Sequence, residues 1–258
     1  MLKERPKPAP KPAVTSTGRG VAAERPNHVW HVDLTIVPTV GGFWVPWLPF
    51  ALPQRWPFCW WVAVVLDHYS RRVMGVAAFR QQPTSEMVRA FLGRTIRQAG
   101  TAPRYIICDK GPQFWCDGFK RWCKRRGVRP RFGAVGKYGS IAVIERFMKT
   151  LKTEGTRKVL VPLRREAFRS ELLSFAAWYN GYRPHMWLGG RTPDEAYHAL
   201  QPANEQPRIE PRARWPAESR CAQPRAPVDG KAGAIVELDV THIAGRKHLP
   251  VVALRRVA

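Results

Sequence analysis

The sequence has no long hydrophobic run. Its longest apolar stretch, residues 56–66, is interrupted and falls short of the roughly 20 residues that span a bilayer. The amino-terminal residues are rich in lysine and proline and contain no apolar signal core, so they do not indicate secretion. These absences argue against a membrane or secreted protein.

The cysteines do not form a metal-binding or disulfide pattern. There are five of them, an odd number, and no two are spaced as Cys-x-x-Cys. Reduced thiols in a cytosolic protein are the simplest interpretation. Cys116 and Cys123 are seven residues apart, but they lack nearby histidines, so we expect no structural zinc there.

Acidic residues are scarce relative to basic ones. The chain of 258 residues holds 19 Asp and Glu against 43 Lys and Arg, a formal charge of +24. Such a field implies a polyanionic partner, with nucleic acid as the first candidate, although ribosomal and membrane-surface proteins share the bias. A hydrophobic content of 45%, with eleven Trp and eleven Phe, excludes a disordered polycation.

Composition divides the chain into four segments. The composition of residues 1–25 predicts a flexible, basic, proline-rich arm. Residues 26–200 have the length and hydrophobic content of one core domain. A proline-rich linker, 201–230, then leads to a small basic β-rich module at 231–258. In that module Arg246, Lys247, Arg255 and Arg256 are candidates for nonspecific DNA contacts.

Hydrophobic periodicity predicts an α/β core. Alternating or continuous apolar residues indicate strands at 30–37, 58–66, 72–79, 104–108 and 128–135. Helical spacing and capping residues indicate helices from Thr84 or Ser85 to 98, at 114–126, 141–158 and 163–179, and from Thr192 onward. This order describes a mixed sheet of five strands covered by helices on both sides.

Three acidic residues occupy positions suited to phosphodiester chemistry. Asp33 interrupts a well-patterned strand, Asp109 directly follows a strand, and Glu145 lies on a helix, with thirty-five residues between the last two. Cleavage by two metal ions needs hard oxygen ligands that converge from separate segments. In so basic a chain, the trio is better explained as a magnesium cage than as scattered acidic residues.

The helix that carries Glu145 also carries lysines. Lys149 and Lys152 follow it at i+4 and i+7 and share its face, which would suit the phosphates of a DNA end. A solvated helix with an i,i+4 ion pair explains the same pattern equally well. Other candidate DNA contacts are Arg183 and the basic face of helix 114–126, which presents Lys120, Arg121, Lys124 and Arg125.

Several motifs resemble those of one enzyme family. They are Trp30-His31-Val32-Asp33-Leu34-Thr35, Asp67-His68-Tyr69-Ser70-Arg71-Arg72, Asp109-Lys110-Gly111-Pro112-Gln113-Phe114, Ile144-Glu145-Arg146-Phe147, Thr150-Leu151-Lys152-Thr153-Glu154, Trp178-Tyr179-Asn180-Gly181-Tyr182-Arg183-Pro184-His185 and Gly190-Arg191-Thr192-Pro193-Asp194-Glu195-Ala196-Tyr197. In order and spacing, over about residues 26–200, the chain resembles the integrase core of retroviral integrases. It is more similar still to the acidic-triad (DDE) transposases of IS3-like insertion sequences.

The resemblance implies a fold, a cofactor and a reaction. The fold would be RNase H-like, with Asp33, Asp109 and Glu145 holding two Mg²⁺ ions, for which Mn²⁺ can substitute. Water would process the 3′ ends of the element, and the freed 3′-hydroxyls would attack a second DNA. Lys149 and Lys152 would contact the element's end.

The same resemblance implies the protein's oligomeric state, location and partners. Two ends must be brought together, so we expect a homo-oligomer, in the prokaryotic cytoplasm at the nucleoid. The family usually carries an amino-terminal helix-turn-helix or zinc module, which this chain lacks. Either a separate helix-turn-helix polypeptide recognises the ends, or the chain is a fragment. Ile141 also replaces the Asn that usually precedes the glutamate.

Other motif residues have plainer explanations. Asp67 is expected to cap a turn through its side chain, and Glu154 to be a solvent-exposed helix residue. His31 is expected to point away from Asp33 and to pack, and His185 to be structural. The tryptophans of 44–61 could stack on bases, although packing is the better interpretation.

Two other functions remain open. The chain could be a non-catalytic DNA-binding remnant that sequesters element ends, although the intact trio argues against decay. It could also be a structure-selective nuclease of the same fold that cuts and never joins strands.

Overall fold

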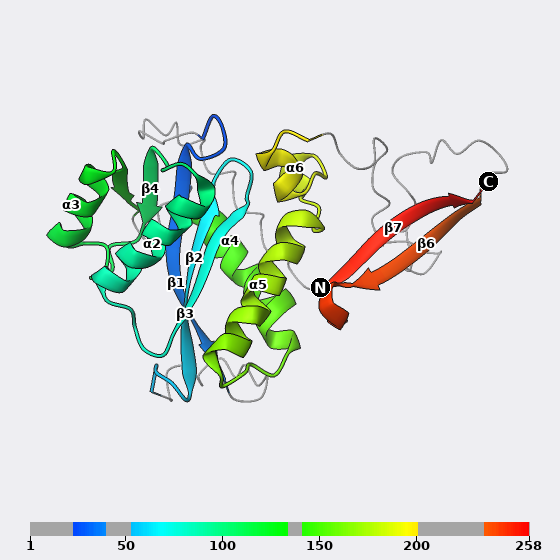
Figure 1. Ribbon diagram of the computed structural model, residues 1–258, viewed down its shortest axis with the longest axis horizontal. Helices are drawn as coiled ribbons and strands as arrows, with labels where there is room; N and C mark the ends of the chain where they lie inside the picture. Colours follow the sequence, from blue (N-terminus) through cyan, green and yellow to red (C-terminus); the bar gives the residue numbers. More distant parts are fainter. Residues whose placement is uncertain (1–22, 40–52, 134–140, 201–234, 258) are drawn as a thin grey trace, which may run out of the picture.

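The computed structural model describes residues 23–39, 53–133, 141–200 and 235–257 (Figure 1). The expected arm at 1–25 and linker at 201–230 therefore lie almost wholly outside the described residues, as do the tryptophans at 44 and 47. The boundaries of the four segments stay predictions. No helix in the described ranges has the length and apolarity needed to cross a membrane.

Five strands form one mixed sheet in the order β3-β2-β1-β4-β5. Their bounds are β1 Val29–Pro38, β2 Cys59–Asp67, β3 Val73–Phe79, β4 Tyr105–Cys108 and β5 Arg129–Phe132. The pairs β1–β2 and β2–β3 are antiparallel, whereas β1–β4 and β4–β5 are parallel. The predicted mixed sheet, in the RNase H-like arrangement, is confirmed.

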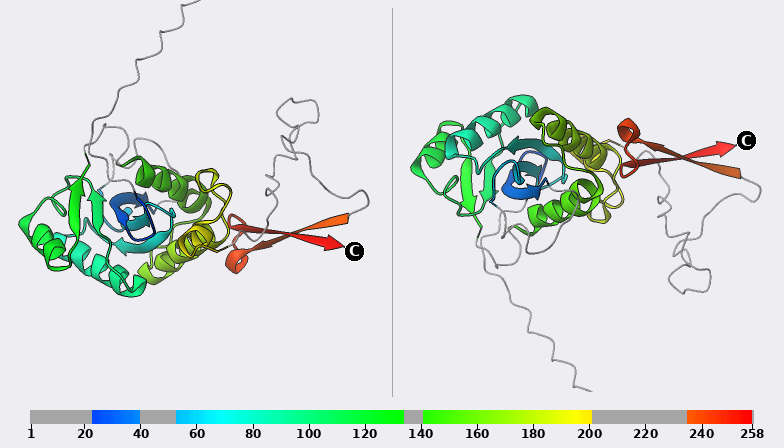
Figure 2. Two further views of the ribbon diagram at one scale, coloured as in Figure 1. Left: turned by 90° about the horizontal axis from the view of Figure 1, so that it is seen from above. Right: turned by 90° about the horizontal axis from the view of Figure 1, so that it is seen from below.

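Helices cover both faces of this sheet, which Figure 2 shows in views along the strands. Side chains alternate along β1, so that Trp30 and Val32 pack with α2 (Ser85–Ala99) and α3 (Asp117–Arg125). Val37 faces the other side, where the core is completed by α4 (Ala142–Thr150) and α5 (Arg165–Gly181). The sheet therefore separates two apolar cores, each closed by its own pair of helices.

Two predicted helices differ in their bounds. The helix expected at 114–126 begins at Asp117, because Cys116 is extended and the amides of Phe114 and Trp115 bond to the carbonyl of Gly111 in a turn. The helix expected at 141–158 is α-helical only to Thr150. It continues as a π-helical turn, η1 (Leu151–Gly155), and a 3-10 turn, η2 (Thr156–Lys158). π-helical turns are frequent at functional sites.

Side-chain caps begin two helices as the sequence predicts. Thr84 accepts a hydrogen bond from the amide of Met87 (3.3 Å) at the start of α2. The short helix α6 (Pro193–Tyr197), which follows the 3-10 turn η3 (Met186–Leu188), opens with a full capping box. Thr192 accepts from the Glu195 amide (3.3 Å), and the Glu195 carboxylate accepts from the Thr192 amide (2.7 Å).

The carboxy-terminal strands form a hairpin docked on α5. Its strands are β6 (Ile235–His242) and β7 (Pro250–Val257), joined through the turn η5 (Ile243–Gly245). At the turn end Leu249 is fully buried in the core beside α4 and α5, and Trp178 donates to the Pro250 carbonyl (2.9 Å). The other end projects from the body (Figure 1).

Arg246 corrects one expectation for this module. Its guanidinium donates to both carboxylate oxygens of Glu171 in α5, at 2.7 Å each. The charge of Arg246 is therefore compensated within the protein and anchors the hairpin, so the residue is a poor DNA contact. The pairing of Arg246 with Glu171 could not be predicted from the sequence, because the two residues are 75 positions apart.

Candidate active site

Asp33 and Asp109 occupy matching positions on neighbouring parallel strands. β1 pairs with β4 so that His31 lies opposite Ile107. Asp33 follows two residues after His31, and Asp109 two residues after Ile107. Because β4 ends at Cys108, Asp109 leaves the strand at its carboxyl end, where α/β sheets place their sites.

A tight turn holds Asp109 in place. The amide of Gly111 donates to its Oδ1 at 3.0 Å. A Cβ atom on residue 111 would also lie 3.0 Å from that oxygen and closer still to the side chain of Gln113. A larger residue at 111 would therefore have to displace the Gln113 side chain or the Asp109 carboxylate.

The three predicted acidic residues interact electrostatically. The pKa of Asp33 is raised to about 6, chiefly by burial and also by the charges of Asp109 and Glu145, while the Leu34 amide and Lys152 act in the lowering direction. That amide donates to Asp33 Oδ1 at 2.8 Å. Asp33 therefore lies within the fields of both other carboxylates, a concentration of like charge that a divalent cation would relieve.

Glu145 reaches this region from α4. Ile144, Phe147 and Met148 bury the helix against the sheet, which leaves Glu145 on its exposed side in the first turn. The residues just before the helix, 134–140, are outside the described ranges. Among the residues that the structure describes, no group of three or more His, Cys, Asp or Glu side chains is arranged to hold a metal ion. The three carboxylates thus influence one another without forming a closed cage.

The two lysines of this helix differ in their surroundings. Lys149 is exposed, whereas Lys152 lies half-buried in the π-helical turn. Burial lowers the pKa of the Lys152 ammonium, and Arg157 adds to this, while the nearby Asp33 raises it. Lys152 is therefore close to the three acidic residues. Lys149, which precedes it by three residues along the helix, faces solvent.

Glu154 and Arg183 correct the expectation for that part of the chain. Glu154, expected to be solvent-exposed, is half-buried and accepts two hydrogen bonds from Arg183, each 2.8 Å long. Arg183 remains a predicted DNA contact, but its charge is already compensated.

The basic face of α3 lies on the other side of the sheet from α4. Its residues Lys120, Arg121, Lys124 and Arg125 project from a helix whose buried side packs with α2. The ammonium of Lys120 lies 4.2 Å from the ring centre of Trp115, a cation–π contact. The structure does not bring these residues together with Lys149 and Lys152, so they form a separate basic surface.

A buried histidine network beside Asp33 was missed. Nε2 of His31 lies 2.7 Å from Nδ1 of His68, and their rings stack. The expectation that His31 points away from Asp33 is wrong, because residues two apart in a strand face the same side. The alternation of β1 was the signal that could have shown this. Burial lowers the pKa of His31 to about 3 and of His68 to about 4, with Arg71 acting in the same direction.

A third histidine, His185, lies half-buried just after α5. His185 packs its ring edge-on against Tyr179, and burial lowers its pKa to about 4. Asn180 bonds to both the amide and the carbonyl of Val73 in β3 (2.8 and 3.0 Å). The expected structural role of His185 fits this packing, and the Asn180 side chain ties the end of α5 to β3.

Asp67 has the turn-capping role that the sequence predicts. It is fully buried and accepts hydrogen bonds from the amides of Asn27 and Ser70 (2.8 Å each) and from the Ser70 hydroxyl (2.7 Å). These donors use both of its oxygens and secure the β2–β3 turn. Asp67 is thus a structural residue rather than a member of the acidic group.

Two family models describe this region of the chain. Both represent the "Integrase core domain", one matching residues 23–137 and the other 126–193. Together they span β1 to α6 and include all three acidic positions.

Curated relatives are transposases of bacterial insertion sequences. The transposase InsF for insertion sequence IS3A of Escherichia coli (strain K12) is 28% identical over 179 residues, covering 67% of this chain and 54% of its own. The transposase for insertion sequence element IS904 of Lactococcus lactis is 23% identical over 173 residues, covering 67% and 62%. The chain spans roughly half to three-fifths of the length of these relatives.

Solved structures of retroviral integrases are similar too. The catalytic core domain of HTLV-2 integrase in complex with magnesium is 21% identical, with a TM-score of 0.49 and coverage of 69% of this chain and 100% of that one. The catalytic core domain of BIV integrase is 21% identical, with a TM-score of 0.49 and coverage of 67% and 95%. On the family models and the curated relatives, the chain belongs to the integrase core domain family as an IS3-like member.

Proposed function

We propose that the protein is the catalytic chain of a transposase that cuts DNA at the 3′ ends of a mobile element and transfers those ends to a second DNA. The observation that carries the proposal is the shared field of three carboxylates from separate segments: Asp33 and Asp109 in matching strand positions, with Glu145 acting on the same group. The similarity to insertion-sequence transposases supports the choice of substrate.

The donor set fits a hard divalent cation. Carboxylate oxygens are the ligands that Mg²⁺ prefers, and the raised pKa of Asp33, near 6, marks a place where added positive charge is favourable. We propose that Asp33, Asp109 and Glu145 hold two Mg²⁺ ions, with Mn²⁺ as a substitute. When bound, such ions stabilise the attacking and leaving oxygens of a phosphodiester.

The residues around the trio would position the DNA. Lys149, exposed one turn after Glu145, is placed to bind phosphate, and Lys152 lies nearer the acidic group. The buried His31, which contacts His68, lies on the same face of β1 as Asp33 and would support the strand there. The turn at Gly111 orients the Asp109 carboxylate.

The oligomeric state, location and partners follow from the proposed reaction. Joining two ends to one target requires at least two copies, so we propose a homo-oligomer working on DNA in the prokaryotic cytoplasm at the nucleoid. A separate helix-turn-helix polypeptide would recognise the element's ends. The candidate DNA contacts on α3 and the module at 231–258 would bind DNA without regard to sequence.

Cleavage and joining assays test the proposal directly. Asp33→Asn, Asp109→Asn and Glu145→Gln should each abolish metal-dependent cleavage and joining and leave DNA binding within about threefold. Glu166→Gln, which removes an exposed carboxylate in the first turn of α5, is the matched control and should remain active. Full cleavage by any trio variant would refute the assignment. Cleavage without joined products would favour a nuclease, and binding without cleavage a DNA-binding remnant.

A further inference from the structure

The surface between α2 and α3 contains an arginine-rich groove. One cavity of about 390 Å³ runs between the two helices, and another of about 350 Å³ lies where β1, β4 and β5 begin. Arg126 lines both cavities, so they adjoin. We call the two together the arginine groove.

Six arginines line the arginine groove: Arg25, Arg89, Arg94, Arg97, Arg104 and Arg126. The small residues Ala90 and Gly93 of α2 also line it, and among the described lining residues one carboxylate is present, that of Glu86. No lysine takes part. A guanidinium binds phosphate oxygens through two parallel hydrogen bonds, so arginine suits a fixed phosphate path better than lysine does.

The arginines of this groove are not ion-paired within the part of the chain that the structure describes. Over the described ranges, none of the six arginines forms an ion pair with a carboxylate, whereas Arg72, Arg183 and Arg246 elsewhere do. Aromatic rings orient two of them instead: Arg126 lies 4.4 Å from the ring centre of Trp122, and Arg104 lies 5.6 Å from that of Tyr105. These contacts position the guanidinium groups and leave their charge available to an anion.

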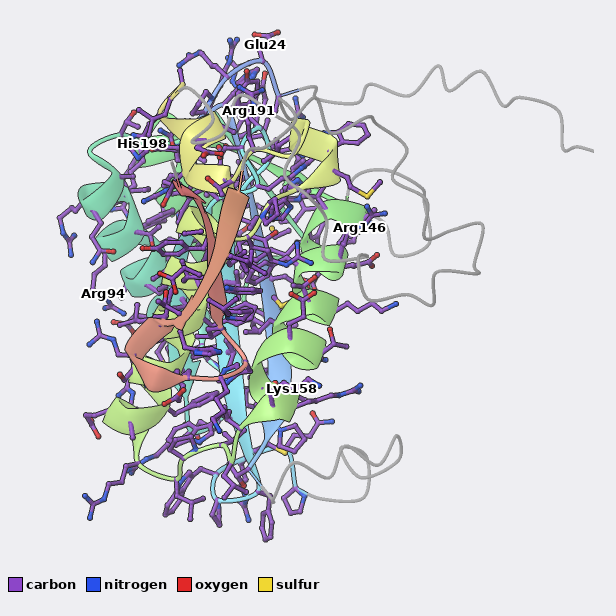
Figure 3. The ribbon with its side chains drawn as sticks, turned by 90° about the vertical axis from the view of Figure 1, so that its right-hand side faces the viewer. Glu24, Arg94, Arg146, Lys158, Arg191 and His198 are labelled. Carbon is purple, nitrogen blue, oxygen red and sulfur yellow. The ribbon has the colours of Figure 1, made fainter. Side chains whose placement is uncertain are left out.

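The part of the arginine groove along α2 lies on the face of the sheet opposite Glu145, and the rest lies where the strands begin, whereas Asp109 follows the carboxyl end of β4. α2 and α3 cover one face, and α4, with Glu145, covers the other. Figure 3 shows Arg94 projecting from α2 on one flank of the molecule and Arg146, the neighbour of Glu145, on the opposite flank. A duplex whose end reaches Glu145 would therefore leave the groove open to another stretch of nucleic acid.

We propose that the arginine groove binds the sugar-phosphate backbone of a second DNA duplex, separate from the duplex whose end lies at the acidic trio. The inference rests on the proposed function in one respect, that DNA is the polyanion the protein handles. Because the contacts go to phosphates, binding is independent of sequence and strongly salt-dependent.

Binding to covalently closed circular DNA tests the proposal without any cleavage. The triple variant Arg94→Ala/Arg97→Ala/Arg104→Ala removes three exposed charges from the groove. The matched control, Arg164→Ala/Arg165→Ala/Arg169→Ala, removes three exposed charges at the start of α5. The dissociation constant is measured between about 50 and 200 mM salt.

The groove variant should bind at least about tenfold more weakly than the parent protein at about 100 mM salt. Its log–log salt slope should fall by about 3, since each lost phosphate contact removes about 0.9. The control should change the slope by less than about 1. Equal losses in both triple variants, or no loss in the groove variant, would overturn the proposal. If the triple variant does not fold, Arg94→Gln/Arg97→Gln should lower the slope by about 2.

A second assay separates this proposal from the proposed function. The groove variant should retain cleavage at an element end and lose about tenfold in joining that end to a circular target. Lys149→Ala should weaken binding to a short end duplex and leave binding to circular DNA nearly unchanged. If the parent protein cuts no DNA at all, the proposed function fails while the binding result stands. If the groove variant joins normally, the groove proposal fails alone.

Discussion

Arg183 and Glu154 form a two-point ion pair, with both hydrogen bonds at 2.8 Å, between the end of α5 and the π-helical turn after α4. About a quarter of the Arg183 side chain and just over a third of Glu154 remain exposed. The pair ties the segment that carries Lys152 to the last turn of α5.

Breaking this pair should affect stability more than DNA binding. Glu154→Gln should lower the free energy of unfolding by about 1–2 kcal/mol, because a partly buried guanidinium loses its charged partner. It should leave DNA affinity unchanged or higher, since it removes a negative charge. Denaturant titration and a DNA-binding assay measure the two effects. If Arg183→Gln loses about tenfold in affinity while Glu154→Gln loses none, Arg183 is a phosphate contact after all.

Removing the charge of Asp33 should stabilise the metal-free protein. Burial and the neighbouring carboxylates raise its pKa to about 6, so keeping Asp33 ionised at neutral pH costs more free energy in the folded protein than in the unfolded chain. Asp33→Asn should raise the melting temperature in chelator by about 2–4 °C, the shift for about 1 kcal/mol. The same variant should lose the further stabilisation that millimolar Mg²⁺ gives the parent protein. An unchanged response to Mg²⁺ would argue against Asp33 as a ligand.

Asp67→Ala should destabilise the fold strongly. It leaves the buried amides of Asn27 and Ser70 without their acceptor, which costs about 2–4 kcal/mol in the free energy of unfolding. Glu166→Ala, which removes an exposed carboxylate, should cost less than about 1 kcal/mol. Equilibrium unfolding in urea compares the two. Similar small costs would mean that the Asp67 network does not secure the turn.

The half-buried histidines His68 and His185 predict a loss of stability in mild acid. The pKa values of His68 and His185 lie near 4 in the folded protein, below their ordinary value of 6.5. Between these values the unfolded chain binds more protons, so the free energy of unfolding falls as the pH falls from about 6.5 towards 4. Urea titrations at pH 7 and 5 measure the slope. His68→Gln and His185→Gln should each flatten it relative to the parent protein, and an unchanged slope in both would contradict the prediction.

The hairpin should contribute to the stability of the core. Leu249→Ala removes a fully buried side chain from the cluster beside α5 and should cost about 2–4 kcal/mol. Val252→Ala, where the parent side chain is 58% exposed, should cost less than about 1 kcal/mol. Hydrogen exchange in β6 and β7 should rise in the first variant and not in the second. A cost below about 1 kcal/mol for Leu249→Ala would mean that the hairpin is an independent module.

Local sequence patterns were enough to predict the order of the strands and helices. Alternation along β1, the Thr84 cap and the capping box at Thr192 depend on a few neighbouring residues, and all three are present in the structure. The candidate trio could be proposed on the same basis, because a carboxylate that interrupts a strand pattern or ends a strand is visible without its partners. Its role stays a prediction for the cleavage assays to test.

Ion pairs between segments far apart in the sequence could not be predicted in this way. The pairing of Arg183 with Glu154 spans 29 residues and that of Arg246 with Glu171 spans 75, and no local pattern marks either. Both arginines looked like free cations in the sequence. Only folding shows that each already has a carboxylate partner.

The sequence by itself determined the strands, most helices, the turn at Asp67 and the basic character of the surface, because each follows from periodicity, capping or charge within a short stretch. Tertiary structure decided which charges remain available. It placed His31 against His68, paired Arg183 and Arg246 with carboxylates, and gathered arginines from α2, α3 and the strand ends into one groove. The physical reason is that electrostatic and packing energies depend on distances in space. Those distances are fixed only when the helices have packed on both faces of the sheet.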